Sequence, residues 1–157
     1  MNSNYQTASA NPNCESAISW DIRMTELIHM ADCIQAAPRE ALDRWRKAES
    51  YATAVMFDTA YSEKERIEAR QEAQRTKIVY IATLAALQSV CVAAGFDSYQ
   101  TRVWTLYYGG EETDLTRIAQ RMKTNVRRIH YLLFSHRMSG RFCFALDQLS
   151  EYAEIQD

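Results

Sequence analysis

The sequence predicts an all-α protein, and three observations support that prediction. Glycine and proline number only 4 and 2 among 157 residues, so few places can turn a β-hairpin. Alanine, glutamate, glutamine, arginine and leucine, which favour helices, are abundant. Apolar residues also recur at spacings of three and four through most of the chain, the spacing of one face of an α-helix.

The length of 157 residues suits one ordinary domain, or a small module joined to a helical region, that buries its own core. The four cysteines (Cys14, Cys33, Cys91 and Cys143) lie far apart without the spacing of a zinc site, which favours reduced thiols in a cytoplasmic protein. Residues 1–14 have neither a basic start nor an apolar run, so we expect a disordered leader and no signal peptide.

The first helix is expected over 15–36, where Ile18, Ile22, Leu27, Met30 and Ile34 recur at helical spacing. Pro38 is expected to end this helix, since proline lacks a backbone N–H, and to open a second helix that extends to about residue 61. The short connection between them predicts a hairpin of two helices.

Ser62 and Glu65 form an S-x-x-E capping box, which predicts the start of a helix of about thirty residues that ends at Gly95. Charges of both signs in its first half indicate a solvated, ion-paired face. Its second half, from Ile78 to Phe96, is apolar nearly all round. Polar residues interrupt this stretch and it is slightly short for a bilayer, so we expect a helix buried in the core and no contact with a membrane.

The remaining elements are shorter. Ser98 is expected to cap a helix that Gly109 and Gly110 end, and two helices follow within 113–134. A closing helix has its apolar side at Phe142, Ala145, Leu146 and Leu149, and residues 150–157 are expected to fray as an acidic tail. The predicted organisation is therefore a helical body over 15–95 followed by a module over 98–149.

The segment 113–134 contains most parts of a helix-turn-helix, which needs two short helices, a small residue where they touch and a tight turn. Leu115, Ile118 and Met122 would form the inner face of the first helix, with Ala119 at the contact. Asn125 is a good N-cap, and Ile129 and Leu132 would anchor the second helix.

Charge distinguishes this segment from the rest of the chain. From Asp114 to Arg141 the chain has seven basic residues and one acidic residue, which gives a net charge of +6. Because the whole chain carries −2, the remainder carries −8. A basic module on an acidic body is typical of a protein that contacts phosphates locally.

With the preceding helix, the stretch "YQTRVWTLYYGGEETDLTRIAQRMKTNVRRIHYLL" resembles region 4 of bacterial sigma factors and related helix-turn-helix modules. The resemblance covers about forty residues and lies in Arg102, Val103, Leu106, Tyr107, the Gly109 loop, Ile118, Ala119, Ile129 and Leu132. Chain length and the late position of the module are similar to phage late-gene antitermination proteins. The turn position that the family often fills with glycine is Lys123, which would have to adopt a left-handed conformation there.

Two groups of residues are expected at the DNA if the second helix enters the major groove. The candidates for base edges are Asn125, Val126, Arg127, His130 and Tyr131. The candidates for phosphates are Arg117, Arg121, Lys123, Arg128 and Arg137.

The predicted function is a DNA-binding transcription regulator of a phage or bacterium, whose partners are double-stranded DNA and, as a candidate, RNA polymerase. The alternative is an adaptor that binds RNA polymerase or another regulator without binding DNA, and plain structural packing of the module also stays open. No phosphate loop, metal-ligand set or nucleophile motif occurs, so we expect neither an enzyme nor a cofactor. His29 and Cys33 lie four apart, but core packing explains them better than a metal.

Overall fold

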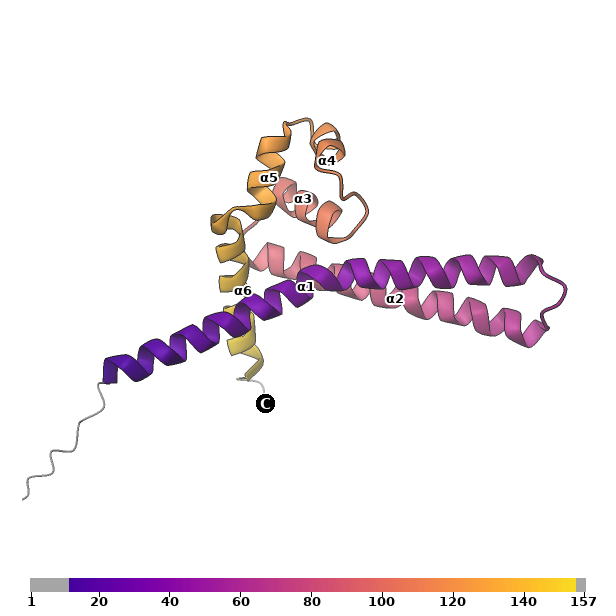
Figure 1. Cartoon of the computed structure of the whole chain (residues 1–157), viewed down its shortest axis with the longest axis horizontal. Helices are drawn as coiled ribbons and strands as arrows, with labels where there is room; N and C mark the ends of the chain where they lie inside the picture. Colours follow the sequence, from indigo (N-terminus) through magenta and orange to yellow (C-terminus); the bar gives the residue numbers. More distant parts are fainter. Residues whose placement is uncertain (1–11, 155–157) are drawn as a thin grey trace, which may run out of the picture.

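Residues 12–154, the part of the chain that this computed structural model describes, form six α-helices and no strand. The helices are α1 (Pro12–Phe57), α2 (Glu63–Ala93), α3 (Ser98–Tyr108), α4 (Leu115–Arg121), α5 (Val126–Phe134) and α6 (His136–Glu154). In Figure 1, α2 returns alongside the second half of α1 to make a long hairpin, which we call the stalk, and α3, α4 and α5 gather at its other end. The prediction of an all-α protein is confirmed.

The first helix does not stop at Pro38. α1 continues for 46 residues with Pro38 inside it, so the predicted break and the helix hairpin at this point were wrong. A proline inside a helix costs about 3 kcal/mol, but the ring of Pro38 is fully buried and its packing offsets part of that cost. Proline is also a usual cause of bending, and α1 changes direction near its middle (Figure 1).

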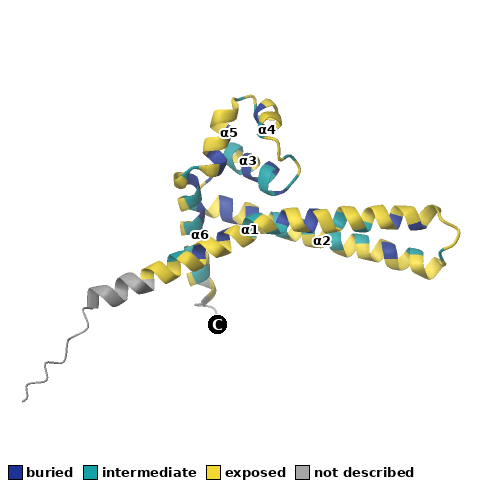
Figure 2. Cartoon of the chain, viewed as in Figure 1, coloured by how far each residue is buried: buried dark blue, intermediate teal, exposed yellow. Residues whose placement is uncertain are grey.

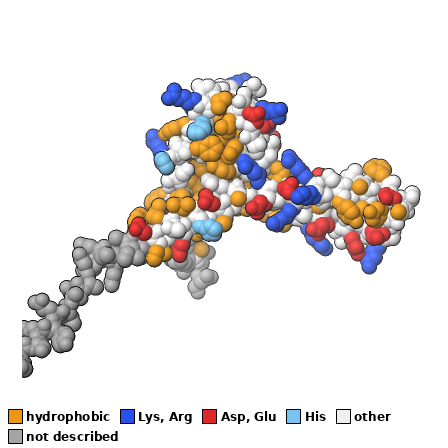
Figure 3. All heavy atoms as spheres, viewed as in Figure 1, with side chains coloured by type: hydrophobic (Ala, Val, Ile, Leu, Met, Phe, Trp, Pro, Cys, Tyr) orange, Lys and Arg blue, Asp and Glu red, His pale blue; other side chains and the backbone are white. Residues whose placement is uncertain are grey.

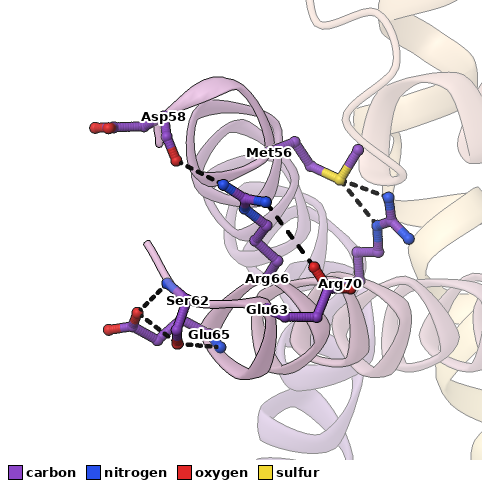
Figure 4. Close-up of polar contacts among 7 residues, drawn as sticks. All are labelled: Met56, Asp58, Ser62, Glu63, Glu65, Arg66 and Arg70. Carbon is purple, nitrogen blue, oxygen red and sulfur yellow. Dashed lines mark hydrogen bonds and ion pairs between the residues drawn. The ribbon is translucent and has the colours of Figure 1, made fainter. Parts of the chain in front are cut away.

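The turn between α1 and α2 follows the predicted capping box. Ser62 Oγ accepts a hydrogen bond from the backbone N–H of Glu65 at 3.3 Å, and the Glu65 carboxylate accepts one from the backbone N–H of Ser62 at 2.7 Å (Figure 4). The carboxylate also accepts the Ser62 hydroxyl at 2.8 Å, and the bonds that it accepts from the backbone N–H and the hydroxyl of Ser62 lower the pKa of Glu65 below its ordinary value of 4.5. Across the turn, Arg66 donates to the backbone oxygen of Asp58 at 3.1 Å. The predicted start of α2 is confirmed.

One main hydrophobic core joins the base of the stalk to the four shorter helices. Trp104 and Phe142 are fully buried at its centre with ring centroids 4.9 Å apart, and Leu27 of α1 and Leu87 of α2 belong to the same cluster. α6 packs against α1 and α2 as well as α5, and Arg23 of α1 forms an ion pair with Asp147 of α6. Residues of 15–95 and of 98–149 therefore share this core.

The apolar half of α2 is less buried than predicted. Leu87, Val90 and Cys91 are buried, but Ile78, Ile81 and Val92 are 56%, 54% and 67% exposed, so the expectation of a helix buried all round was wrong (Figure 2). By length and composition alone α2 could cross a membrane, although only 17% of its most apolar window is buried within the protein. The reason for the difference is that α1, α3 and α6, the helices that pack on α2, leave these side chains uncovered.

The helix ends largely follow the local signals. Gly95, at φ +73°, follows the last turn of α2, and α3 ends before Gly109, as expected. The N-cap of α3 is Asp97 and not Ser98, because the Asp97 carboxylate accepts the N–H of Gln100 at 2.7 Å. In α6, Leu149 is 43% exposed and does not join the buried side formed by Phe142, Ala145 and Leu146.

The two ends of the chain are described only in part. Of the leader expected over 1–14, residues 1–11 lie outside the described part, while Pro12 begins α1. Of the tail expected over 150–157, residues 155–157 lie outside it, and α6 continues to Glu154.

Candidate nucleic-acid interface

The turn between α4 and α5 depends on Lys123. Its φ of +53° is the left-handed value that the sequence required, and among non-glycine residues of 12–154 no other has a positive φ. This conformation lets the N–H of Thr124 reach the oxygen of Ala119 at 3.0 Å and the N–H of Lys123 reach that of Gln120 at 3.2 Å. Both bonds satisfy carbonyls at the end of α4, in a Schellman motif that normally uses glycine.

The two helices meet through the residues that the spacing predicted. Ile118 and Ala119 of α4 and Ile129 and Leu132 of α5 are all buried, with Ile118 and Ile129 at 0% exposure. Asn125 caps α5, since its side-chain oxygen accepts the backbone N–H of Arg128 at 2.8 Å. The inner faces of both helices are therefore anchored and the outer face of α5 stays on the surface.

All ten predicted interface residues are exposed. On α5 and its cap these are Asn125, Val126, Arg127, Arg128, His130 and Tyr131, and around them are Arg117, Arg121, Lys123 and Arg137. Figure 3 shows lysine and arginine side chains on the outer surface of the end that α3, α4 and α5 form. Val126 and Tyr131 are 40% and 49% exposed, so this face of α5 also offers apolar and aromatic surface.

Several of these side chains already have partners. Arg121 forms an ion pair of 2.9 Å with Glu111, and the Asn125 oxygen is engaged in the cap. The guanidinium of Arg128 lies 5.5 Å from the centre of the Tyr99 ring on α3, a cation–π contact that holds it beside the start of α5. Among the side chains that the structure describes, those of Arg127 and Lys123 take part in no hydrogen bond or ion pair.

Arg141, which contributes to the +6 charge of the segment, serves the fold instead. It donates to the backbone oxygen of Ala94 at 3.2 Å and to that of Gly95 at 2.6 Å, beyond the end of α2. Its guanidinium also lies 5.0 Å from the centre of the Phe96 ring. The side chains of the other basic residues except Arg121 form no hydrogen bond or ion pair with the described side chains; they are Arg117, Lys123, Arg127, Arg128 and Arg137.

A shallow groove of about 520 Å³ runs beside the start of α5. Its walls come from α3 and α5 and comprise Gln100, Asn125, Arg127, Arg128, Tyr131 and Leu132. The sequence interpretation missed Gln100 and Tyr99 as neighbours of this surface. The signal for Gln100 was the D-x-x-Q capping box that starts at Asp97, whereas nothing in the sequence placed Tyr99 under Arg128.

The part of the chain that the structure describes contains no group of three or more histidine, cysteine, aspartate or glutamate residues that could hold a metal ion. The expected core packing of His29 and Cys33 was wrong, because both side chains are exposed on α1. Cys33 Sγ lies 3.8 Å from His29 Nε2, and no third ligand joins them in the described part of the chain. In the core, burial raises the pKa of Cys91 and of Tyr108 to about 12.

Comparisons of this chain with protein-family models, with curated proteins and with solved structures found no match.

Proposed function

We propose that this protein binds double-stranded DNA through a helix-turn-helix formed by α4 and α5, and that it acts as a transcription regulator. The observation that supports this most is the two-sided character of α5. Ile129 and Leu132 anchor one side in the core, while Arg127 and Tyr131 lie exposed on another. A short, anchored helix with a free polar face can enter the major groove.

The exposed residues divide by what they would contact. Arg127 is unpaired within 12–154 and would donate two hydrogen bonds to a guanine, with Val126, His130 and Tyr131 against neighbouring bases. Lys123, Arg128, Arg117 and Arg137 would contact phosphates. Asn125 and Arg121 would contribute less than the sequence suggested, since both are already engaged.

The test is fluorescence anisotropy of the full chain with labelled duplexes of random sequence at several salt concentrations. Four phosphate contacts predict a slope of about −3 to −4 in a plot of log affinity against log salt. Arg128→Ala should weaken binding to all duplexes similarly and reduce the slope by about one unit, whereas Arg127→Ala should cost about 1 to 3 kcal/mol on a selected site and relax sequence preference.

Lys64→Ala is the control, because Lys64 is exposed in the first turn of α2, at the end of the stalk away from α3, α4 and α5 (Figure 1). It should leave both affinity and slope unchanged. Absence of salt-sensitive binding by the folded wild-type chain would refute the proposal, as would equal losses from Lys64→Ala and Arg128→Ala.

A second candidate function is an adaptor that binds RNA polymerase or another regulator without touching DNA. It is supported by the tip of the stalk, where Phe57 is 84% and Tyr51 is 55% exposed, a surface of the kind that proteins dock on. Two results together would favour the adaptor. The chain would bind a protein partner stoichiometrically and lose that binding in Phe57→Ser, and it would not bind DNA at low salt.

A further inference from the structure

The outer face of α2 is apolar and uncovered within the described chain. Its exposed positions follow the seven-residue repeat of helix pairing, with Ile78, Ala82, Ala85, Ser89 and Val92 separated by four, three, four and three residues, and Ile81 lies beside them. The whole stretch from Ile78 to Phe96 contains no charged residue. An uncharged, helical face of this length is the kind that buries itself against another helix.

On this face two large apolar side chains, Ile78 and Val92, lie at equal distances on either side of Ala85. Ile78 lies seven residues before it and Val92 seven after, so large side chains flank a centre of alanines and a serine. If two copies of the face meet antiparallel, Ile78 of each opposes Val92 of the other and Ala85 meets Ala85. The small central residues then allow the helices to approach closely, and the contact is the isologous kind that a two-fold axis requires.

The charges at the two ends of the face are also complementary in this arrangement. Arg75, whose side chain is 72% exposed and lies 3.7 Å from the Glu72 carboxylate, is at the amino-terminal end. The exposed Asp97, whose carboxylate also caps α3, lies beyond the carboxyl-terminal end. Antiparallel pairing brings Arg75 of one copy toward Asp97 and the negative end of the helix dipole of the other. Parallel pairing would instead bring arginine to arginine.

We propose that the chain forms a homodimer in which the outer faces of two α2 helices pack antiparallel about Ala85. A second copy fits this face better than a bilayer does. The same helix packs on α1, α3 and α6, and Tyr80 donates to the backbone oxygen of Gly109 at 3.3 Å, so lipid could not surround α2 without breaking these contacts. The dimer does not depend on DNA binding.

The first test is the mass of the full chain by sedimentation equilibrium over a range of concentrations. The monomer has a mass of 18.1 kDa, and the expected species has twice that mass. Ala85→Glu should shift the chain to monomer while its helical circular dichroism is kept, because Ala85 is exposed in the single chain. Ala54→Glu places the same change on an exposed position of α1 and should leave the dimer intact.

The second test is the direction of pairing. Ile78→Cys and Val92→Cys chains, mixed and oxidised, should give a disulfide-linked 78–92 peptide by mass spectrometry, and Ile78→Cys alone should not link to itself. A monomeric wild-type chain, a dimer unchanged by Ala85→Glu, or a 78–78 link would overturn the proposal. The proposal would also be overturned if the monomer sedimented with phosphatidylcholine vesicles and Ala85→Glu abolished this binding.

Discussion

The indole N–H of Trp104 in α3 donates to the backbone oxygen of Leu132 in α5 at 2.8 Å. Leu132 lies in the last turn of α5, which ends at Phe134, so its carbonyl has no partner four residues further along the same helix. Trp104 thus completes the end of the proposed recognition helix while its ring fills the centre of the core.

Trp104→Phe should therefore lower stability with little loss of helix. The unsatisfied carbonyl of Leu132 accounts for about 1 to 3 kcal/mol of the free energy of unfolding, and the smaller ring adds a cavity term. Urea unfolding followed by circular dichroism measures the loss. Trp20→Phe, at a position 61% exposed, should change stability by less than about 0.5 kcal/mol, and equal effects would contradict the role given to Trp104.

Lys123→Gly should separate stability from DNA affinity. Glycine relieves about 1 to 2 kcal/mol of left-handed strain at φ +53°, against about 0.4 to 1 kcal/mol of added freedom in the unfolded chain, so the variant should be more stable by up to about 1.6 kcal/mol. Loss of the ammonium should reduce the salt slope by about 0.9. Lys123→Ala loses the same charge without relief of strain. The two variants should therefore have the same salt slope by anisotropy, and only Lys123→Gly should be more stable than the wild type in urea unfolding.

The capping box of α2 predicts a pH dependence. Because hydrogen bonds from Ser62 lower the pKa of Glu65 in the folded chain below 4.5, its contribution is present above that value and is lost as the pH falls through the folded pKa. Glu65→Gln keeps the acceptor but does not ionise. The melting temperature of the wild type should exceed that of Glu65→Gln at neutral pH and converge on it in acid, whereas parallel profiles would exclude the capping carboxylate as the cause.

The cysteines should differ in reactivity. Burial raises the pKa of Cys91 to about 12, and its sulfur is fully covered, so alkylation by iodoacetamide in the folded chain should be slow. Cys33 is exposed on α1 and should react first. Peptide mapping after timed alkylation gives both rates, and denaturant should bring them together. A Cys91 that reacts as fast as Cys33 in the native chain would show that the core opens readily.

Sequence reasoning succeeded where the signal is local. The capping box at Ser62, the cap at Asn125 and the left-handed turn at Lys123 each depend on a few neighbouring residues, and all three are present. The buried positions of α4 and α5, such as Ile118 and Ile129, also followed from helical spacing. Local rules such as these act within one or two turns of a helix and do not require knowledge of distant segments.

The failures involve contacts between distant parts of the chain. Pro38 was expected to break α1, but burial of its ring lets the helix continue. The amino-acid composition of α2 did not indicate which of its faces other helices cover and which stays exposed. The partners of Arg121 and Arg141 lie ten or more residues away, so counting charges along the sequence overstated the basic surface by two arginines.

The stalk also sets a distance. α2 has 31 residues, so it is about 46 Å long at 1.5 Å per residue, and its base shares a core with the helices that hold α5. One turn of B-DNA advances about 34 to 36 Å. If α5 docks in a major groove, the exposed Phe57 at the far end can be held roughly one helical turn or more from the bound site. The length of the stalk would then fix the distance between the DNA site and a protein bound at Phe57. Insertion or deletion of whole α-helical turns in the stalk would change which position along the duplex that protein can occupy.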